Sequence, residues 1–316
     1  MNVLVTGAGL VGCNTARILR ERGHQAVLYD IAPRERYIRS VAGDVAVERG
    51  DIRDLAALVD TMQRHKVQAV VHTAFLISGP LTERPYSGMR TNVDGALAVL
   101  EASRLSGAKR MLFASTQGVY NYDLADRPIP EEHPFSEADH FYVASKVACE
   151  RLLRGLAASS GLEFAIVRFA QIYGLGHYAA GDLAGPAMHN VLADALAGRP
   201  VRIDPGVLSD NDYVYAKDVA MGVALACEQP LRRQAYNLGS GKLGTPDQVA
   251  AAIRAAVPGA AVEVLSAPVI GPFWVHQHYL DITRAQADLG YRPAYDLAKG
   301  MLDFVSDMKL QAAVQE

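Results

Sequence analysis

The first half of the chain alternates short apolar runs with longer stretches in which apolar residues recur at helical spacing. Runs of β-branched residues predict strands, and a spacing of three and four predicts amphipathic helices. Strands are expected at Val3–Thr6, Ala26–Asp30, Ala69–His72, Arg110–Ser115 and Glu163–Phe169. Helices are expected at Gly12–Arg22, Asp54–His65, Asn92–Ser106 and Tyr142–Ser159. This alternation predicts an α/β fold with a doubly wound parallel sheet, because parallel strands need crossover helices that cover both faces.

The pattern changes after Phe169, where glycine and proline become frequent. Helices are expected at Met188–Gly198 and Asp218–Glu228, and Thr245-Pro246 is typical of a helix start, with threonine as the cap. We therefore expect a first domain over residues 1–170, to which residues 212–237 return. Residues 171–211 and 238–316 are expected to form mainly a smaller C-terminal substrate-binding lobe.

Composition narrows the class of protein. The 316 residues are 50% hydrophobic and 21% charged, with a net charge of −3, which is typical of a soluble globular chain and not of a nucleic-acid-binding protein. The chain does not open with a charged segment followed by a long apolar stretch, so we expect a cytoplasmic protein with no membrane contact. The three cysteines lie far apart without metal-ligand spacing, so we expect buried thiols and no metal site.

A glycine-rich turn follows the first predicted strand. Gly7, Gly9 and Gly12 form the pattern GxGxxG, and Leu10 and Val11 open the helix that follows. Glycines allow a tight turn and a close approach of the backbone to a pyrophosphate, which then lies at the N-terminus of the helix. In this context the turn predicts a Rossmann-type domain that binds a dinucleotide.

Asp30, at the end of the second predicted strand, indicates which dinucleotide. A carboxylate at this distance from the turn accepts hydrogen bonds from the ribose hydroxyls and repels a 2′-phosphate. NAD is therefore favoured, while Arg34 and Arg36 close by leave NADP open.

A tyrosine and a lysine lie four residues apart in the fourth predicted helix. The spacing of Tyr142 and Lys146 puts both side chains on one helix face. A neighbouring ammonium lowers the pKa of a tyrosine, which can then act as a general base or acid near neutral pH.

Further segments give a resemblance that runs over nearly the whole chain. With the two motifs above, the chain resembles an extended short-chain dehydrogenase/reductase of the NAD-dependent epimerase/dehydratase family. The segments and the family patterns that they resemble are Gly50–Asp54 (GDIRD), Val71–Ala74 (VxHxAA), Asn92–Gly95 (NVxGT), Phe113–Tyr120 (the strand end before VYG), Arg168–Gly174 (RxxNVYG), Asp212–Ala220 (DYVxxxDVA) and Asp281–Ala285 (DxSKA).

The resemblance implies roles for individual residues. Tyr142 would be the catalytic base, Lys146 would hold the nicotinamide ribose, and the hydroxyl of Thr116 would bond the reacting oxygen. Ser115 is an alternative one residue earlier, although a strand-end hydroxyl satisfied within the protein is the simpler interpretation.

Other residues would serve the cofactor and the assembly. By the same resemblance Asp51 and Ile52 would contact the adenine, Ala74 would line the cofactor site, and Asn92 would order the active-site helix. The helices Asn92–Ser106 and Tyr142–Ser159 pair across a dimer axis in relatives, so a homodimer is expected.

Departures from the family pattern bear on the substrate. Gln117-Gly118 replaces the Asp-Glu pair of sugar dehydratases, which argues against dehydration. Nucleotide-sugar epimerases usually carry an arginine where this chain has Asn211, and a second one near Gly271. Bidentate arginine is the natural anchor for a diphosphate, so we expect a substrate without one. The candidate substrate contacts are Ser115, Gln171, His177, Trp274 and His276.

Three functions are consistent with these residues. The favoured hypothesis is an NAD-dependent dehydrogenase that acts on a secondary alcohol of a sugar-like or other small hydroxylated molecule. An NAD-dependent sugar or nucleotide-sugar epimerase is the alternative, because it shares the first half-reaction. A non-catalytic NAD-sensing protein on the same fold is a rival from another class.

Overall fold

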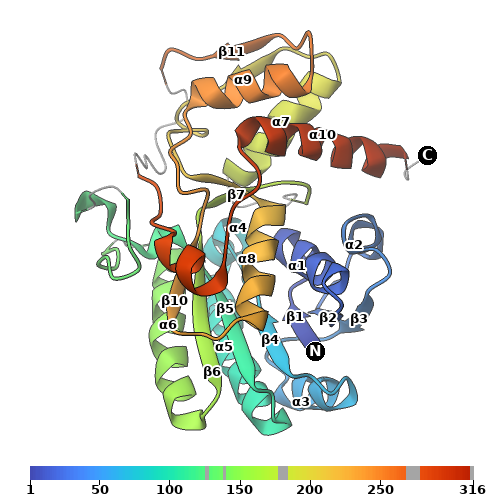
Figure 1. Cartoon of the computed structure of the whole chain (residues 1–316), viewed down its shortest axis with the longest axis vertical. Helices are drawn as coiled ribbons and strands as arrows, with labels where there is room; N and C mark the ends of the chain where they lie inside the picture. The colour runs from blue at the N-terminus through green and yellow to red at the C-terminus, as the bar shows by residue number, and fades with distance from the viewer. Residues whose placement is uncertain (125–127, 138–139, 177–183, 268–277, 314–316) are drawn as a thin grey trace.

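The structure is a computed structural model, and it describes residues 1–124, 128–137, 140–176, 184–267 and 278–313. A seven-stranded sheet forms its centre (Figure 1). In spatial order the strands are β3 (Ala46–Arg49), β2 (Gln25–Asp30), β1 (Asn2–Thr6), β4 (Ala69–His72), β5 (Arg110–Thr116), β6 (Glu163–Phe169) and β10 (Ala235–Leu238).

All neighbouring strands in this sheet are parallel. The order of the chain through the sheet reverses between β1 and β4. In sheets of this kind the crevice at the carboxyl ends of the strands, beside the reversal, is where ligands bind. The predicted α/β Rossmann-type fold is confirmed.

Helices cover both faces of the sheet because successive strand residues point to opposite sides. Val3 and Val5 of β1 face one core, and Leu4 between them faces the other. The first core packs α1 (Leu10–Glu21), α2 (Glu35–Ala42) and α8 (Ala216–Glu228). The second packs α3 (Leu55–Arg64), α5 (Pro85–Ser106) and α6 (Phe141–Ser160), and a short helix, α4 (Ser78–Glu83), precedes α5.

A second group of elements lies beyond the carboxyl edge of the sheet, in the upper part of Figure 1. It contains α7 (Ala184–Leu196), α9 (Pro246–Ala256), α10 (Leu297–Ala313) and the parallel pair β8 (Val201–Ile203) and β11 (Val262–Val264). A further parallel pair, β7 (Gln171–Tyr173) and β9 (Tyr213–Tyr215), lies between this group and the sheet. The chain leaves the central sheet after β6 and returns to it at β10; the expected domain boundaries stay a prediction.

The predicted elements are present, with differences at their ends. The strands Ala69–His72 and Glu163–Phe169 have the predicted bounds, whereas α5 starts at Pro85 rather than Asn92 and α7 at Ala184 rather than Met188. The helix start at Thr245 is confirmed, because its side chain and that of Gln248 form a capping box. Within the described ranges, every helix is too short or too polar to cross a membrane.

Candidate active site

The glycine turn between β1 and α1 has room for a ligand on one side only. Gly7 has φ +89°, and a Cβ at this position would lie 2.7 Å from the backbone nitrogen of Ala74. A Cβ on Gly12 would lie 1.8 Å from the carbonyl oxygen of Gly7, whereas one on Gly9 would meet nothing within 4 Å. No side chain caps the start of α1 at Gly9. The open side and the uncapped amides suit an anionic group, so these residues fit the pyrophosphate of a dinucleotide.

Asp30 orders the turn as well as ending β2. Its carboxylate accepts hydrogen bonds from the backbone N–H groups of Ala8 and Ala32, each at 2.8 Å. A carboxylate has about four acceptor positions, so capacity remains for ribose hydroxyls. The contact with Ala8, inside the glycine turn, is a role that sequence reasoning missed.

The segment after β3 lies beside Asp30, since the N–H of Gly50 donates to the Asp30 carbonyl oxygen at 3.0 Å. Asp51 is bound by Arg53, which lowers the pKa of that carboxyl. Ile52 is buried and packs against Gly95 of α5. The structure thus brings the predicted adenosine-binding residues of β2 and of this loop together.

Thr116 is the last residue of β5, and its hydroxyl oxygen accepts a hydrogen bond from the N–H of Gly118 at 3.1 Å. A Cβ on Gly118 would lie 3.5 Å from that oxygen and 3.7 Å from Val143 of α6. Gly118, which donates to the Thr116 hydroxyl, therefore lies between Thr116 and the first turn of the helix that carries Tyr142. Ser115, by contrast, is buried and donates its hydroxyl to Glu150 at 2.6 Å, so the structure does not bring it to the open site.

Tyr142 and Lys146 occupy the first turns of α6, at the carboxyl edge of the sheet. The Lys146 ammonium donates to the carbonyl oxygen of Ala114 at 2.6 Å and is 3% exposed. Burial lowers the pKa of Lys146 to about 7. Two of its three donors remain for other partners. Tyr142 is half-buried, and its ring lies edge-on to that of Phe75.

Asn92 fixes the segment that follows β4. Its side-chain oxygen accepts from the N–H of Leu76 at 2.8 Å, and its amide donates to the Leu76 carbonyl oxygen at 3.0 Å. The same amide reaches the Ser145 hydroxyl of α6 at 3.5 Å. Asn92 therefore links α5, the loop after β4 and the active-site helix.

A buried ion pair supports α6 from below. Arg168 of β6 donates to both carboxylate oxygens of Glu150, at 3.0 and 2.5 Å, and also to the Tyr120 hydroxyl at 2.9 Å. Both charged side chains are almost fully buried. Sequence reasoning missed Glu150, although an acid four residues after Lys146 on an otherwise apolar helix face was the available signal.

Comparison with known proteins decides the family. A model described as the NAD dependent epimerase/dehydratase family matches residues 3–239 of the 316. The chain belongs to the NAD-dependent epimerase/dehydratase family. It is 28% identical to a UDP-glucose 4-epimerase of Erwinia amylovora, over 96% of each chain. It is 32% identical to a UDP-glucose 4-epimerase of Azospirillum brasilense, over 71% of this chain and 67% of that one.

Solved structures of the epimerase/dehydratase family give the same result. A UDP-glucose 4-epimerase from Stenotrophomonas maltophila, with bound NAD and formylated UDP-arabinopyranose, has a TM-score of 0.84 at 26% identity, over 100% of this chain and 99% of that one. Family membership confirms the predicted NAD cofactor and the prediction of a short-chain dehydrogenase/reductase type of enzyme.

The predicted substrate contacts of this family member are only partly described. Gln171 lies on β7, and its N–H donates to the Asp212 carbonyl oxygen at 2.9 Å. Three other candidates, His177, Trp274 and His276, lie outside the described residues.

Asn211, which stands where family epimerases usually carry arginine, is buried. Its side-chain oxygen accepts a hydrogen bond from the Gln117 amide at 2.9 Å. The rings of Tyr122 and His278 are stacked, with their centroids 5.9 Å apart. The sequence does not predict this pair, because 156 residues separate the two in the chain.

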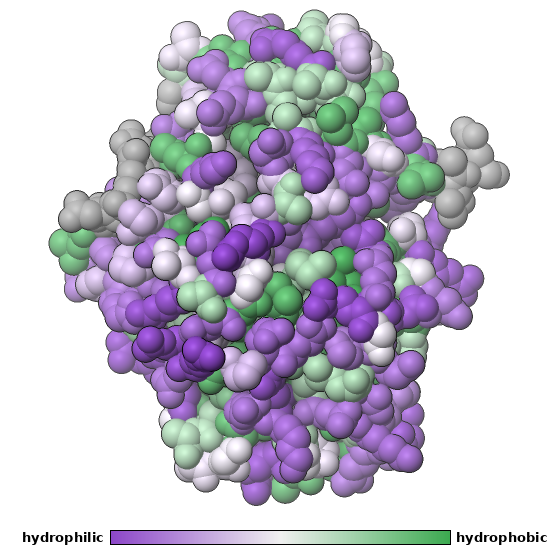
Figure 2. Space-filling view, in the orientation of Figure 1, coloured by the Kyte–Doolittle hydropathy of each residue, from purple (hydrophilic) through white to green (hydrophobic). Residues whose placement is uncertain are grey.

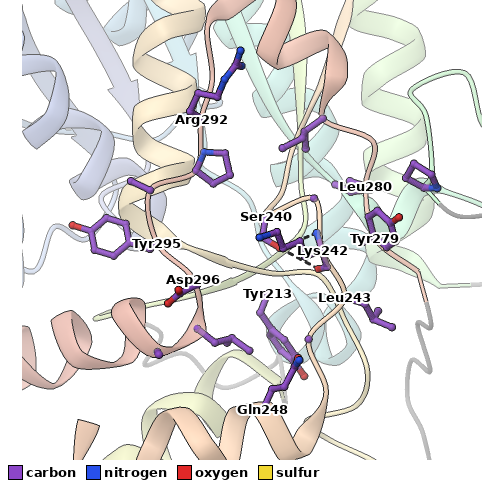
Figure 3. A pocket seen from close by; sticks show the side chains of 18 of the residues that line it. Tyr213, Ser240, Lys242, Leu243, Gln248, Tyr279, Leu280, Arg292, Tyr295 and Asp296 are labelled. Carbon is purple, nitrogen blue, oxygen red and sulfur yellow. Dashed lines mark hydrogen bonds between the residues drawn. The ribbon is translucent and has the colours of Figure 1, made fainter. Parts of the chain in front are cut away.

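A cavity of about 920 Å³ lies between the loop 240–244, α9 and the segment 279–298. Figure 3 shows Ser240 and Lys242 on the loop, with Tyr295 and Asp296 across from them. Thr116, Tyr142 and Lys146 are not among its lining residues. This cavity is therefore not the space in which the predicted catalytic groups meet.

Proposed function

We propose that this enzyme uses NAD to oxidise a secondary hydroxyl of a nucleotide-activated sugar to a ketone and then to reduce that ketone again, with net epimerisation. The observation that carries the proposal is the set of Thr116, Tyr142 and Lys146 beside the open glycine turn, at one edge of the sheet. Two relatives that match nearly the whole chain are UDP-glucose 4-epimerases. They support an epimerase that acts on a nucleotide sugar over the dehydrogenase that the sequence alone favours.

The catalytic groups would divide the work as follows. The Tyr142 phenolate removes the hydroxyl proton of the substrate, while the Thr116 hydroxyl bonds the same oxygen and orients it. The Lys146 ammonium stabilises the phenolate and has two donors left for ribose hydroxyls. Bound NAD supplies the hydride acceptor. Tyr142 would then return the proton to the oxygen of the keto sugar, and the re-formed hydroxyl would belong to the epimer where the sugar has turned its other face to the cofactor.

A net dehydrogenase of a smaller sugar is the second candidate, and Asn211 favours it. A neutral amide already bonded to Gln117 offers a diphosphate neither the charge nor the bidentate donors of arginine. Release of the oxidised product would then leave reduced cofactor in solution.

An assay with two readouts tests both candidates. The enzyme is incubated with NAD and with nucleotide sugars, free sugars, sugar acids and aryl alcohols, and isomer and net NADH are measured separately. Isomer from a nucleotide sugar without net NADH supports the epimerase. Net NADH from a substrate without a diphosphate supports the dehydrogenase and contradicts the main proposal.

Tyr142→Phe tests the catalytic assignment. The variant retains the ring but loses the group that moves the proton, so kcat is expected to fall by about a hundredfold to ten-thousandfold with little change in NAD affinity. Tyr86→Phe is the matched control, because Tyr86 is 78% exposed on α5. Turnover by Tyr142→Phe at the wild-type rate would contradict the assignment.

We infer in addition that the enzyme acts in the cytoplasm as a homodimer. The three cysteines are free and buried, as thiols are in a reducing compartment, which supports the first inference. The resemblance of α5 and α6 to the dimer helices of relatives supports the second.

A further inference from the structure

The ring of Phe75 lies against the Lys146 ammonium. Phe75 follows β4, and the Lys146 nitrogen lies 3.5 Å from the centroid of its ring. The ring of Phe113 is the next nearest, at 4.8 Å. An ammonium at this distance over an aromatic face is attracted by the negative charge of the ring face, and the attraction is stronger where water is excluded.

The same ring touches the other half of the predicted catalytic pair. The centroids of Phe75 and Tyr142 are 6.0 Å apart with an interplanar angle of 79°, an edge-to-face contact. The ring of Phe113 of β5 also packs against Phe75, with the two ring centroids 6.2 Å apart. The segment is also held by Asn92, through the two hydrogen bonds to Leu76. Phe75 is therefore a fixed ring in contact with both Tyr142 and Lys146.

This arrangement comes from a departure in the sequence. In the pattern VxHxAA, the histidine corresponds to His72 and the first alanine to Ala74, so the second alanine corresponds to Phe75. An alanine there has no aromatic face to offer the ammonium. The contact is thus a property of this chain that the motif comparison alone does not reveal.

The charged and titratable groups around Lys146 give it little other support. On its own helix these are Tyr142, Cys149 and Glu150, and from β4 it faces His72. Burial lowers the pKa of His72 to about 3 and raises that of Cys149 to about 11, so both are neutral near pH 7.

Glu150 is the remaining charge, and it is shared with a cation. Its carboxylate is bound on both oxygens by Arg168. Burial meanwhile disfavours the charged form of Lys146 and lowers its pKa to about 7. The aromatic face of Phe75 opposes this loss of the proton.

We propose that Phe75 is a positioning residue, whose ring holds the Lys146 ammonium beside Tyr142 and orients the Tyr142 ring. The inference rests on the proposed function, because it gives Phe75 a task only if Tyr142 and Lys146 carry the chemistry.

The test compares Phe75→Leu with Phe75→Tyr over a range of pH. Leucine fills much of the space without an aromatic face, so Lys146 should lose its proton about one pH unit earlier. We expect kcat/KM of Phe75→Leu to fall about tenfold above the pH optimum, with a smaller loss below it. Phe75→Tyr retains the face and should follow the wild-type profile.

NAD binding gives a readout that does not need turnover. Calorimetry should find that the NAD affinity of Phe75→Leu weakens at a lower pH than that of the wild type, because Lys146 is the expected ribose ligand. Phe75→Met takes the place of Phe75→Leu if the latter does not fold. Thermal unfolding of each variant separates loss of fold from loss of alignment.

Two results would overturn the inference. One is an unchanged pH profile in Phe75→Leu, and the other is an equal loss in Phe75→Leu and Phe75→Tyr at every pH. Failure of the catalytic assignment is distinguishable, because Tyr142→Phe would then turn over at the wild-type rate whatever residue stands at position 75. Failure of the epimerase proposal alone is also distinguishable, because it appears as net NADH in the assay of the wild type.

Discussion

Asp30 has two tasks at the scale of single residues. It holds the glycine turn through the N–H of Ala8, and it is the predicted acceptor for the ribose hydroxyls. A substitution there therefore affects the shape of the phosphate site as well as the choice of cofactor.

Asp30→Ala is expected to weaken NAD binding by about tenfold to a hundredfold, which corresponds to the loss of a hydrogen bond to a charged group. The NADP affinity should fall less, because the repulsion of its 2′-phosphate is removed together with the hydrogen bond. Calorimetric titration of both dinucleotides measures the ratio. An equal loss for both would contradict the role of Asp30 in selecting NAD.

His72 makes the protein sensitive to acid. Its ring is hydrogen-bonded to Thr6 of β1 at 2.7 Å, and burial lowers its pKa to about 3. The unfolded chain binds that proton near pH 6.5, so below this pH the unfolded state holds more protons than the folded state. The free energy of unfolding should therefore decrease as the pH is lowered from about 6.5 to about 3, by up to about 1.4 kcal/mol per pH unit.

Denaturant unfolding of the wild type and of His72→Gln measures this contribution. The variant has no titrating group at position 72, so its stability should fall less steeply with pH in the same window, even if it is less stable at neutral pH. Parallel curves for the two proteins would contradict the assignment.

The sequence predicts single residues well where the local pattern carries the information. The GxGxxG turn and the spacing of Tyr142 and Lys146 are local patterns, and they are the basis of the predicted cofactor and catalytic sites. Glu150, Arg168 and Phe75 matter through partners that come from other strands and helices. A local signal such as the four-residue spacing of Lys146 and Glu150 can indicate a residue but not its distant partner, so only the structure shows the pairing.

At the scale of elements, burial decides which segments could be predicted. Strand β4 and most of β6 are buried, and both consist mainly of apolar residues, so the sequence predicts both strands with the observed bounds. The sequence does not predict the edge strand β3, because most of its four residues are exposed and two of them are charged. The sequence does not predict the start of α5, because glycine and polar residues dominate its first turns.

The loop between β4 and α4 contacts both the predicted cofactor site and the predicted catalytic residues. Ala74 lies against Gly7 of the phosphate turn, Phe75 against Lys146, and Leu76 is held by Asn92. Three consecutive residues thus touch the glycine turn, the predicted catalytic pair and α5. Changes in this loop should therefore affect binding and turnover together.

At the scale of the whole molecule, α2 beside the central sheet contacts the segment that follows β7. The Tyr37 hydroxyl of α2 donates to the Leu175 carbonyl oxygen after β7, at 3.1 Å. On the face drawn in Figure 2, hydrophobic side chains lie in small groups among hydrophilic ones. Contacts such as that of Tyr37 with Leu175 join distant parts of the chain. The sequence therefore predicts the C-terminal lobe only in outline.

Exposed leucines on the paired helices α5 and α6 give the expected homodimer a test. Leu152 and Leu156 are 45% and 44% exposed and lie one turn apart on α6, and Leu105 of α5 is 47% exposed. If this face joins two copies, a charge introduced there is buried without a partner. Light scattering should find a dimer for the wild type and a monomer for the double variant Leu152→Glu and Leu156→Glu.

Leu310→Glu is the matched control, because Leu310 is 64% exposed on α10, a helix that lies apart from α5 and α6 (Figure 1). It should remain dimeric. A wild-type monomer, or a dimer that survives both substitutions, would contradict the proposed assembly.

Tyr142 is proposed to remove the hydroxyl proton of the sugar as the hydride passes to NAD, and rapid mixing measures this step. NAD-loaded enzyme is mixed with a UDP-sugar, and the absorbance of the reduced nicotinamide is followed within a single turnover. We expect a signal that rises and then decays as the epimer forms, and no such signal in Tyr142→Phe. Tight NAD binding without reduction by any sugar, or equally fast reduction in Tyr142→Phe, would rule out this role of Tyr142.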